Sequence, residues 1–268
     1  MPRLKVGAVH LSYEERGSGD PILFIPGLIG LAVQWSHQVD YFADNHRAVA
    51  FDHRGAGHSD RPMQEYTTSL FAEDAVGLLD TLGIGQAHIV GASTGGAIAQ
   101  VLALDHPSRV RSLTLVSTWA RPDAYYGRIQ EMRKRVLLAM GVEPYIKLSS
   151  LWTEGPAQFR DMLGRLEAYE AAQVEQAAPA EVIAARIDAT LKHDRLDDLP
   201  RITAPTMVIV ADDDILVPPY LGATIAAAIP GARLVRMREG GHNSFRKDPA
   251  GFNRILAQFL ASMAFTSS

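Results

Sequence analysis

The chain contains no cysteine among its 268 residues. That absence excludes disulfide bonds, thiolate metal ligands and a cysteine nucleophile together. An excess of charge of one sign is also missing, because 26 Lys and Arg stand against 30 Asp and Glu, a net charge of −4. A balance this close to neutral gives no electrostatic reason to expect a nucleic acid or an acidic membrane surface as a partner.

Long apolar runs are absent as well. The longest, residues 22–33, is interrupted by a proline and two glycines, and it is too short to span a bilayer. Residues 1–6 lack the apolar core and cleavage site of a signal peptide. We therefore expect a cytoplasmic protein with no membrane partner, and the sequence leaves open whether it forms a homo-oligomer.

What is present is an alternation of strand and helix patterns. Buried strands are predicted from short continuous apolar runs, and helices from apolar residues that recur at helical spacing. A leading hairpin of residues 4–9 and 10–15 comes first. Further strands are predicted at 21–25, 48–51, 87–90, 110–116, 206–210 and 232–236, and helices at 71–82, 96–104 and 252–260. The pattern predicts an α/β fold, a mostly parallel eight-stranded sheet with helices on both faces.

The alternation stops between Arg121 and Arg201. This stretch contains five prolines and no convincing buried strand, and its helical spacing includes Ile129, Met132, Val136 and Leu137. We interpret residues 122–200 as an all-helical lid inserted into the core. The core then consists of residues 1–121 and 201–268, with the lid over the carboxyl edge of the sheet.

The most informative segment is Gly91-Ala92-Ser93-Thr94-Gly95, which lies between a predicted strand and a predicted helix. A serine in so tight a turn, with glycines two positions to either side, has the pattern of a nucleophile elbow. Side chains at Gly91 and Gly95 would collide with the strand or the helix. We therefore predict that Ser93 is a nucleophile.

A serine nucleophile needs a base and an acid that orients the base. His242 follows the last strand within a glycine-rich loop, where a general base is required. Asp212, Asp213 and Asp214 follow the strand 206–210. Position after the strand end favours Asp214 as the acid, with Asp213 as the alternative. None of the nine histidines forms a pair with convincing metal-ligand spacing, so we expect no metal and no cofactor.

Two backbone N–H groups should stabilise the oxyanion that forms on the attacked carbonyl. The residue after the nucleophile, Thr94, supplies one, and Leu28, in the loop after the strand 21–25, supplies the other. For the substrate we hypothesise that Arg121 binds a carboxylate, a task suited to a guanidinium; a surface arginine at a hinge is the alternative. Aromatic residues that could line the pocket are Trp35, Trp119, Tyr125, Tyr126 and Trp152.

These motifs resemble those of the α/β-hydrolase fold enzymes over nearly the whole chain. They are Ile25-Pro26-Gly27-Leu28, the segment from Asp52 to Ser59, the Ser93 turn, Ala211-Asp212-Asp213-Asp214 and Gly240-Gly241-His242. The similarity is greatest to 3-oxoadipate enol-lactonases and aminoacrylate/carbamate hydrolases, the latter also through Trp119-Ala120-Arg121. The resemblance implies Ser93, His242 and Asp214 as catalytic residues and the amides of Leu28 and Thr94 as the oxyanion hole.

The sequence departs from the family at two positions. Pro26-Gly27 replaces the usual His-Gly before the oxyanion loop, so the support of that loop must differ, and Ala211 replaces a glycine. We predict a cofactor-independent serine hydrolase of small esters or lactones. Amide or carbamate C–N cleavage, C–C cleavage, perhydrolase activity and a non-catalytic ligand receptor remain alternatives.

Overall fold

The computed structural model of the chain describes residues 1–154 and 156–264. Its centre is one eight-stranded sheet in the order β1-β2-β4-β3-β5-β6-β7-β8. β1 pairs antiparallel with β2 and β2 with β4, and every other neighbouring pair is parallel. The strands are Arg3–Val6 (β1), Val9–Arg16 (β2), Asp20–Ile25 (β3), His46–Phe51 (β4), Ala87–Ala92 (β5), Val110–Val116 (β6), Thr206–Ala211 (β7) and Arg233–Met237 (β8). The predicted mostly parallel eight-stranded sheet is confirmed.

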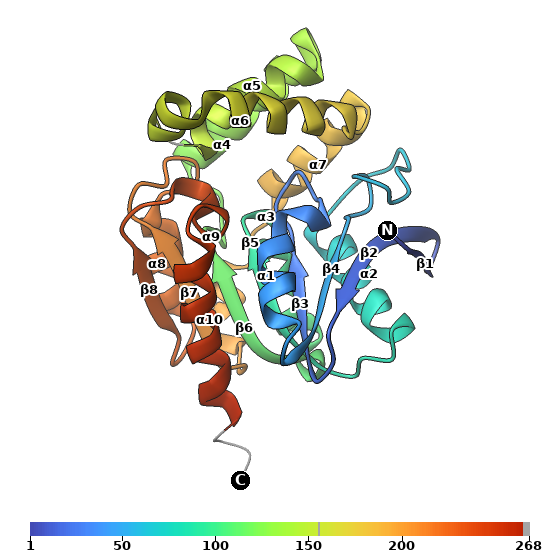
Figure 1. Cartoon of the computed structure of the whole chain (residues 1–268), viewed down its shortest axis with the longest axis vertical. Helices are drawn as coiled ribbons and strands as arrows, with labels where there is room; N and C mark the ends of the chain where they lie inside the picture. The colour runs from blue at the N-terminus through green and yellow to red at the C-terminus, as the bar shows by residue number, and fades with distance from the viewer. Residues whose placement is uncertain (155, 265–268) are drawn as a thin grey trace.

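Helices cover both faces of this sheet (Figure 1). Leu23 and Ile25 of β3 belong to the core under one layer, and Ile22 and Phe24 to the core under the other. A strand that is buried on both faces reads as a continuous apolar run, and for that reason β3 was recognisable in the sequence. The first layer contains α2 (Thr68–Thr81), α3 (Thr94–Asp105) and α8 (Pro219–Ala228), and the second contains α1 (Ser36–Phe42) and α10 (Pro249–Ala264).

The leading hairpin is present, but its predicted boundary is wrong. Val6 pairs with Val9, so the turn lies at Gly7 and Ala8 rather than between Val9 and His10. Gly7 has a φ of 55°, a left-handed conformation that glycine adopts without steric cost. The position of this glycine therefore sets the hairpin register.

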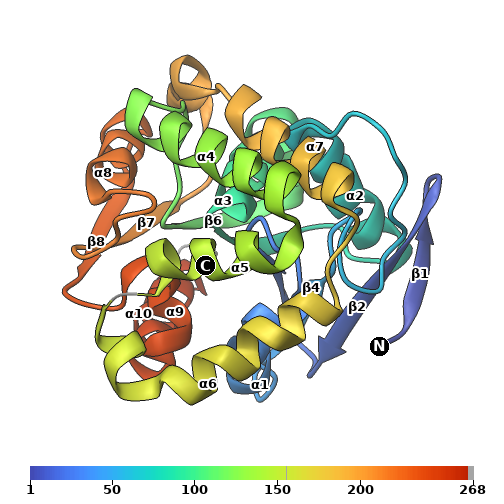
Figure 2. The same cartoon turned by 90° about the horizontal axis from the view of Figure 1, so that it is seen from above.

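Helices α4 (Ala124–Met140), α5 (Val142–Thr153), α6 (Pro156–Glu175) and α7 (Ala180–Lys192) form a separate layer beyond one edge of the sheet (Figure 1). Seen from above, α5 runs between α4 and α6 across the middle of the molecule (Figure 2). α5 also contacts η4 (Gly241–Asn243), the turn that follows β8. In the described part of residues 122–200 every regular element is a helix.

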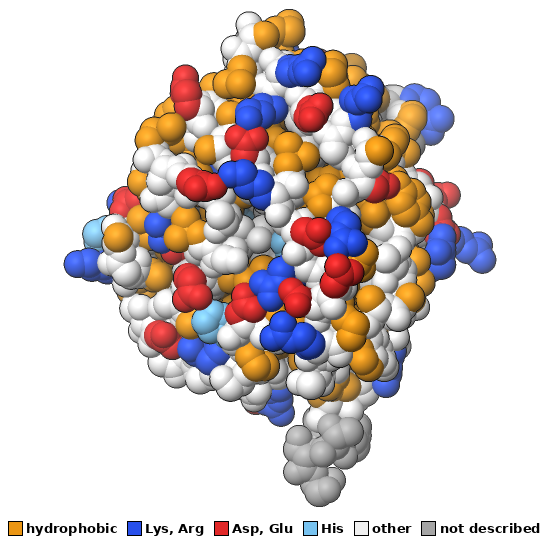
Figure 3. All heavy atoms as spheres, turned by 180° about the vertical axis from the view of Figure 1, so that it is seen from behind, with side chains coloured by type: hydrophobic (Ala, Val, Ile, Leu, Met, Phe, Trp, Pro, Cys, Tyr) orange, Lys and Arg blue, Asp and Glu red, His pale blue; other side chains and the backbone are white. Residues whose placement is uncertain are grey.

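The shorter elements are 3₁₀ turns and one short helix: η1 (Ala32–Trp35), η2 (Pro107–Arg109), η3 (Leu196–Arg201) and α9 (Ser244–Lys247). Over the described residues, no helix has the length and apolar character needed to cross a bilayer. On the face shown in Figure 3, acidic and basic side chains alternate rather than gather by sign.

Candidate active site

Ser93 occupies the turn between β5 and α3 with a strained backbone. Its φ of 54° and ψ of −120° lie outside the regions that non-glycine residues ordinarily adopt. A Cβ at Gly91 would lie 2.2 Å from the carbonyl oxygen of Gly95, and one at Gly95 would lie 2.1 Å from that of Ile25. The turn therefore requires glycine at both positions. The hydroxyl of Thr118 donates a hydrogen bond of 2.7 Å to the carbonyl oxygen of Ser93, which fixes the turn from the neighbouring β6 side.

His242 and Asp214 come together from the ends of two adjacent strands. Asp214 follows β7, His242 lies in η4 after β8, and the imidazole Nδ1 is 2.9 Å from Asp214 Oδ2. Both residues are buried, with 6% and 3% of their surface exposed. The other carboxylate oxygen accepts hydrogen bonds from the backbone N–H groups of Leu216 at 3.0 Å and Val217 at 2.9 Å. The carboxylate is therefore held in one orientation toward the imidazole.

Asp213, the alternative acid, makes different contacts. Its carboxylate accepts hydrogen bonds from the backbone N–H groups of Gly240 at 3.2 Å and Gly241 at 2.8 Å. These two glycines directly precede His242, and both have positive φ values. Asp213 thus holds the loop that carries His242, whereas Asp214 contacts the imidazole itself.

Ser93 and His242 line one cavity of about 60 Å³. In the part of the chain that the structure describes, no hydrogen bond joins Ser93 Oγ to His242. Contacts between a nucleophile and its base are often longer without substrate and tighten when it binds. The carboxyl ends of β5 and β8 therefore place a hydroxyl and an imidazole at the same small space.

The loop after β3 passes directly against Ser93. A Cβ at Gly27 would lie 3.4 Å from Ser93 Cβ, and the next residue, Leu28, lines the cavity. The N–H of Leu28 makes no backbone hydrogen bond within the described residues. The N–H of Thr94 is the first of α3 and has no partner within the helix. Both predicted oxyanion donors thus lie next to Ser93 with N–H groups not used by the helices or the sheet.

The support of this loop comes from the segment after β4. The N–H of His53 donates to the carbonyl oxygen of Gly30, and the N–H of Ala32 donates to Asp52 Oδ1, each at 2.8 Å. These contacts join the motif that begins at Asp52 to the loop that contains Pro26-Gly27. They support this loop in a sequence that has Pro26-Gly27 before it.

The predicted aromatic residues are not among those that line the cavity. Trp35 is fully buried and stacks on Phe245 with the ring centroids 4.2 Å apart. Trp119 is also fully buried and packs on Tyr126 at the same separation, with Trp152 against that cluster. The exposed Tyr125 donates its hydroxyl hydrogen to the carbonyl oxygen of Ile215. Trp35, Trp119 and Tyr126 are core residues, and large rings stabilise the fold most where they lose the most water. Tyr125 is a surface residue.

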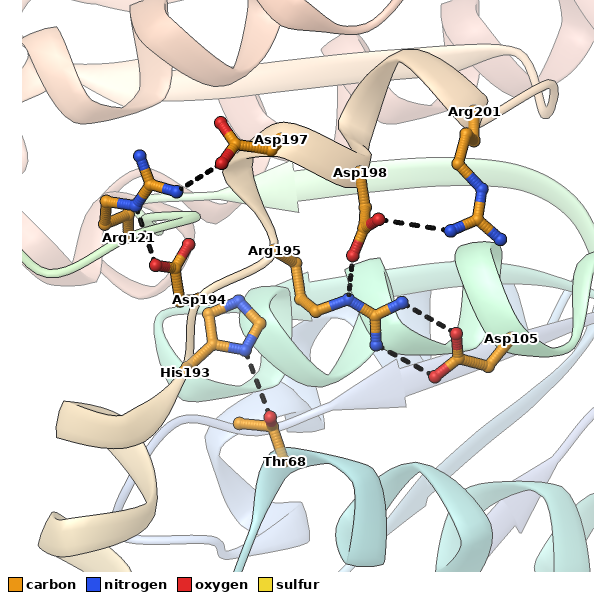
Figure 4. A network of polar contacts seen from close by, with 9 residues as sticks. All are labelled: Thr68, Asp105, Arg121, His193, Asp194, Arg195, Asp197, Asp198 and Arg201. Carbon is orange, nitrogen blue, oxygen red and sulfur yellow. Dashed lines mark hydrogen bonds and ion pairs between the residues drawn. The ribbon is translucent and has the colours of Figure 1, made fainter.

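Arg121 lies outside the cavity as well. Figure 4 shows its guanidinium between Asp194 and Asp197, with nitrogen–oxygen distances of 2.7 and 2.8 Å. Its side chain is 42% exposed, and the two carboxylates already occupy the guanidinium. The structure therefore places Arg121 at the base of α4 in a surface network that also includes Arg195 and Asp198, and not beside Ser93.

Sequence reasoning missed the polar residues on the buried side of α4 and α5. Met132, expected on an apolar stripe, is 45% exposed, whereas Gln130 and Arg133 are 2% and 4% exposed. The signal was a glutamine and an arginine one helical turn apart, in register with buried Tyr126 and Leu137. The polar residues of α4, α5 and α6 that line the cavity are Gln130, Arg133, Tyr145, Ser149, Ser150, Thr153, Tyr169 and Gln173.

One further contact joins the helical layer to the His242 turn. Glu154, which directly follows α5, accepts a hydrogen bond of 2.6 Å from the side-chain amide of Asn243, and its carboxylate lies 3.3 Å from Lys247 Nζ. Asn243 directly follows His242 and lines the cavity.

Within residues 1–154 and 156–264, no group of three or more acidic or histidine side chains could hold a metal ion.

Comparison with known proteins gives one consistent result. The family model described as alpha/beta hydrolase fold matches residues 20–249. A protein of Azorhizobium caulinodans with the name "Putative carbamate hydrolase RutD" is 37% identical over 98% of this chain and 99% of its own length. The crystal structure of the enol-lactonase from Burkholderia xenovorans LB400 superposes with a TM-score of 0.89, at 26% identity, over 97% of this chain and 100% of that one. A malate-bound esterase from Thermogutta terrifontis has a TM-score of 0.88 at 26% identity, over 98% and 99% of the two chains.

Proposed function

The chain belongs to the α/β-hydrolase fold family and is a hydrolase, and from that premise we propose that it cleaves a small ester or lactone through an acyl-enzyme on Ser93. The observation that supports this most is the buried contact between His242 Nδ1 and Asp214 Oδ2 at 2.9 Å. Because Nδ1 is used in that contact, Nε2 is the imidazole nitrogen that can accept the hydroxyl proton of Ser93. His242 and Ser93 also line the same cavity.

In the proposed reaction, Ser93 Oγ attacks the carbonyl carbon while His242 Nε2 takes the hydroxyl proton. Asp214 stabilises the imidazolium that results, and the N–H groups of Leu28 and Thr94 stabilise the oxyanion. Collapse of the intermediate transfers the proton to the leaving oxygen and leaves Ser93 acylated. His242 then activates a water molecule, which releases the acid and restores the hydroxyl.

The helical segment 122–200 acts in this proposal as a lid. Its helices supply the polar cavity wall opposite Ser93, including Gln130 from α4 and Ser149 from α5. The cavity has a volume of about 60 Å³, which favours a small substrate. The lid therefore selects the substrate, while the core carries out the bond cleavage.

Carbamate C–N cleavage is the second candidate. The name of the 37% identical relative, which matches along nearly the whole chain, favours it. Both reactions pass through a tetrahedral intermediate and need the same proton transfers. Rates of hydrolysis for a methyl ester, a lactone and a carbamate of similar size would rank ester or lactone cleavage against carbamate cleavage.

The test is hydrolysis of p-nitrophenyl acetate by the wild type and by Ser93→Ala. Loss of the nucleophile should lower kcat by about 10³-fold or more, and a fluorophosphonate probe should label the wild type but not Ser93→Ala. Ser69→Ala, an exposed serine of α2, is the matched control and should keep both activity and labelling. Wild-type turnover by Ser93→Ala would refute the proposal, and wild-type protein without turnover or labelling would favour a ligand receptor.

A further inference from the structure

Arg133 is a buried cation in the wall of the cavity that contains Ser93 and His242. It lies on the inner side of α4 and is 4% exposed. Among the described residues that line this cavity it is the one lysine or arginine. A guanidinium taken out of water is costly unless its charge is compensated.

The residues around Arg133 do not compensate that charge. Its Nε donates to Ser149 Oγ at 3.0 Å, Nη1 to Gln130 Oε1 at 2.9 Å and Nη2 to Tyr145 OH at 3.1 Å. All three acceptors are neutral, and within the described residues no carboxylate lies within ion-pair distance of Arg133. Buried Arg54 shows the usual alternative, because it is paired with the carboxylate of Asp74.

The same three contacts leave part of the guanidinium unused. A guanidinium has five N–H donors, and three of them are bound to Ser149, Gln130 and Tyr145. One donor on each Nη remains, and the Tyr145 ring lies 5.3 Å from the guanidinium carbon. Arg133 is therefore held in place by neutral groups with two donors left over.

Arg186 is the other buried arginine without an acidic partner in the described part of the chain, but its position differs. It lines a neighbouring cavity of about 40 Å³ and donates to the carbonyl oxygen of Gly55 at 3.2 Å. Its side chain also packs against Gly30, where a Cβ would lie 2.4 Å from Nη2. Arg186 therefore supports the loops after β3 and β4, whereas Arg133 faces the space beside Ser93.

We infer that Arg133 binds a carboxylate of the substrate, so that the molecule hydrolysed at Ser93 is a short anionic ester, lactone or carbamate. This inference rests on the proposed function and names its substrate class. Two free donors match the two oxygens of a carboxylate, and a single positive charge matches its single negative charge. A dianionic phosphate would leave one charge uncompensated, since no other lysine or arginine of the described chain lines the cavity.

Binding to Ser93→Ala tests the inference without dependence on turnover. The ligands are monomethyl succinate and its neutral counterpart methyl succinamate, which have nearly the same size, with inorganic phosphate as a third. We expect the carboxylate to bind about 10- to 100-fold more tightly than the amide in calorimetry, and phosphate to bind more weakly than the carboxylate. Equal affinity for the acid and the amide, or tighter binding of phosphate, would overturn the assignment.

Variants then assign the effect to one side chain. Arg133→Gln in the Ser93→Ala background should remove the preference for the carboxylate, and Arg133→Lys should keep only part of it, because lysine lacks the planar pair of donors. Arg135→Gln removes an exposed charge from the same helix and should keep the full preference. Equal loss of the acid and the amide in Arg133→Gln, or the same change in Arg135→Gln, would show a merely structural or long-range effect and overturn the inference.

Turnover by the enzyme with Ser93 intact separates this inference from the proposed function. For Arg133→Gln, kcat/KM should fall about 10- to 100-fold more on monomethyl succinate than on methyl succinamate. If Ser93→Ala retained wild-type turnover while Arg133→Gln lost carboxylate binding, the nucleophile assignment would fail on its own. Unchanged selectivity in Arg133→Gln would overturn the carboxylate assignment and leave the nucleophile intact.

Discussion

Substitution of Gly95 by alanine should damage both the fold and the proposed activity. The added Cβ would lie 2.1 Å from the carbonyl oxygen of Ile25 and 2.6 Å from that of Pro26, and Cβ atoms essentially never approach closer than 3.0 Å. Because both neighbours are backbone atoms, either α3 or the end of β3 with the loop after it must move by about 0.9 Å, the shortfall of 2.1 Å against 3.0 Å. Overpacking of this kind costs about 3 kcal/mol.

The expected changes are measurable in two ways. A loss of about 3 kcal/mol should lower Tm by roughly 6–12 °C for a domain of this size. The displaced loop also carries the predicted oxyanion donor Leu28, and a shift near 1 Å in a reacting group can cost about 10²-fold in rate. Thermal melting and kcat/KM on p-nitrophenyl acetate would record the two effects separately.

Gly127→Ala is the matched control. Gly127 lies within α4, its φ is not in the left-handed region, and a Cβ there would meet no atom within 4 Å. Alanine is favoured over glycine in a helix by about 0.5–1 kcal/mol, so this variant should be as stable as the wild type or slightly more stable. A Gly95→Ala protein with wild-type Tm and wild-type kcat/KM would refute the steric reasoning about the turn.

Two other predictions follow from the site and the core. Asp214→Asn should lower kcat by about 10⁴-fold because the amide favours the wrong tautomer of His242. Asp213→Asn keeps an oxygen acceptor for the loop and should lose less than about tenfold; equal losses of kcat in p-nitrophenyl acetate assays would contradict the different roles of Asp213 and Asp214. Burial holds the pKa of His88 and His193 at about 4. The unfolded chain therefore binds protons more readily than the folded one, and stability present above pH 6.5 is lost toward pH 4, by up to about 1.4 kcal/mol per unit for each histidine. In urea unfolding at several pH values, the free energy of unfolding should depend less steeply on pH for His193→Gln than for the wild type. An unchanged dependence on pH would count against this account.

The fold could be predicted from the sequence because its strands are buried on both faces. A strand such as β3 or β7 then appears as a continuous apolar run that no surface element imitates. The hairpin boundary failed because β2 is partly exposed and its ends are set by one residue, Gly7, whose left-handed backbone the apolar pattern does not record.

The residues at the ends of strands could also be located from the sequence, since a parallel sheet brings its carboxyl ends to one edge. Choosing between Asp213 and Asp214 depends on where each carboxylate points, which is decided by the turn after β7. The substrate residues could not be located in this way. Trp35 and Arg121 have the right chemistry for a pocket, but one is in the core and the other is held by two surface aspartates.

The two walls of the cavity belong to different parts of the polypeptide. The loops after β3, β5, β7 and β8 form one wall, and α4, α5 and α6 form the other. If the cavity binds the substrate as proposed, replacements on the inner side of α4, α5 and α6 should alter the molecules that fit, and the strand ends should stay in place while the contact between Glu154 and Asn243 is kept. Laboratory evolution toward a new compound should therefore accumulate its first beneficial changes in α4–α6 and leave the loops beneath them unaltered.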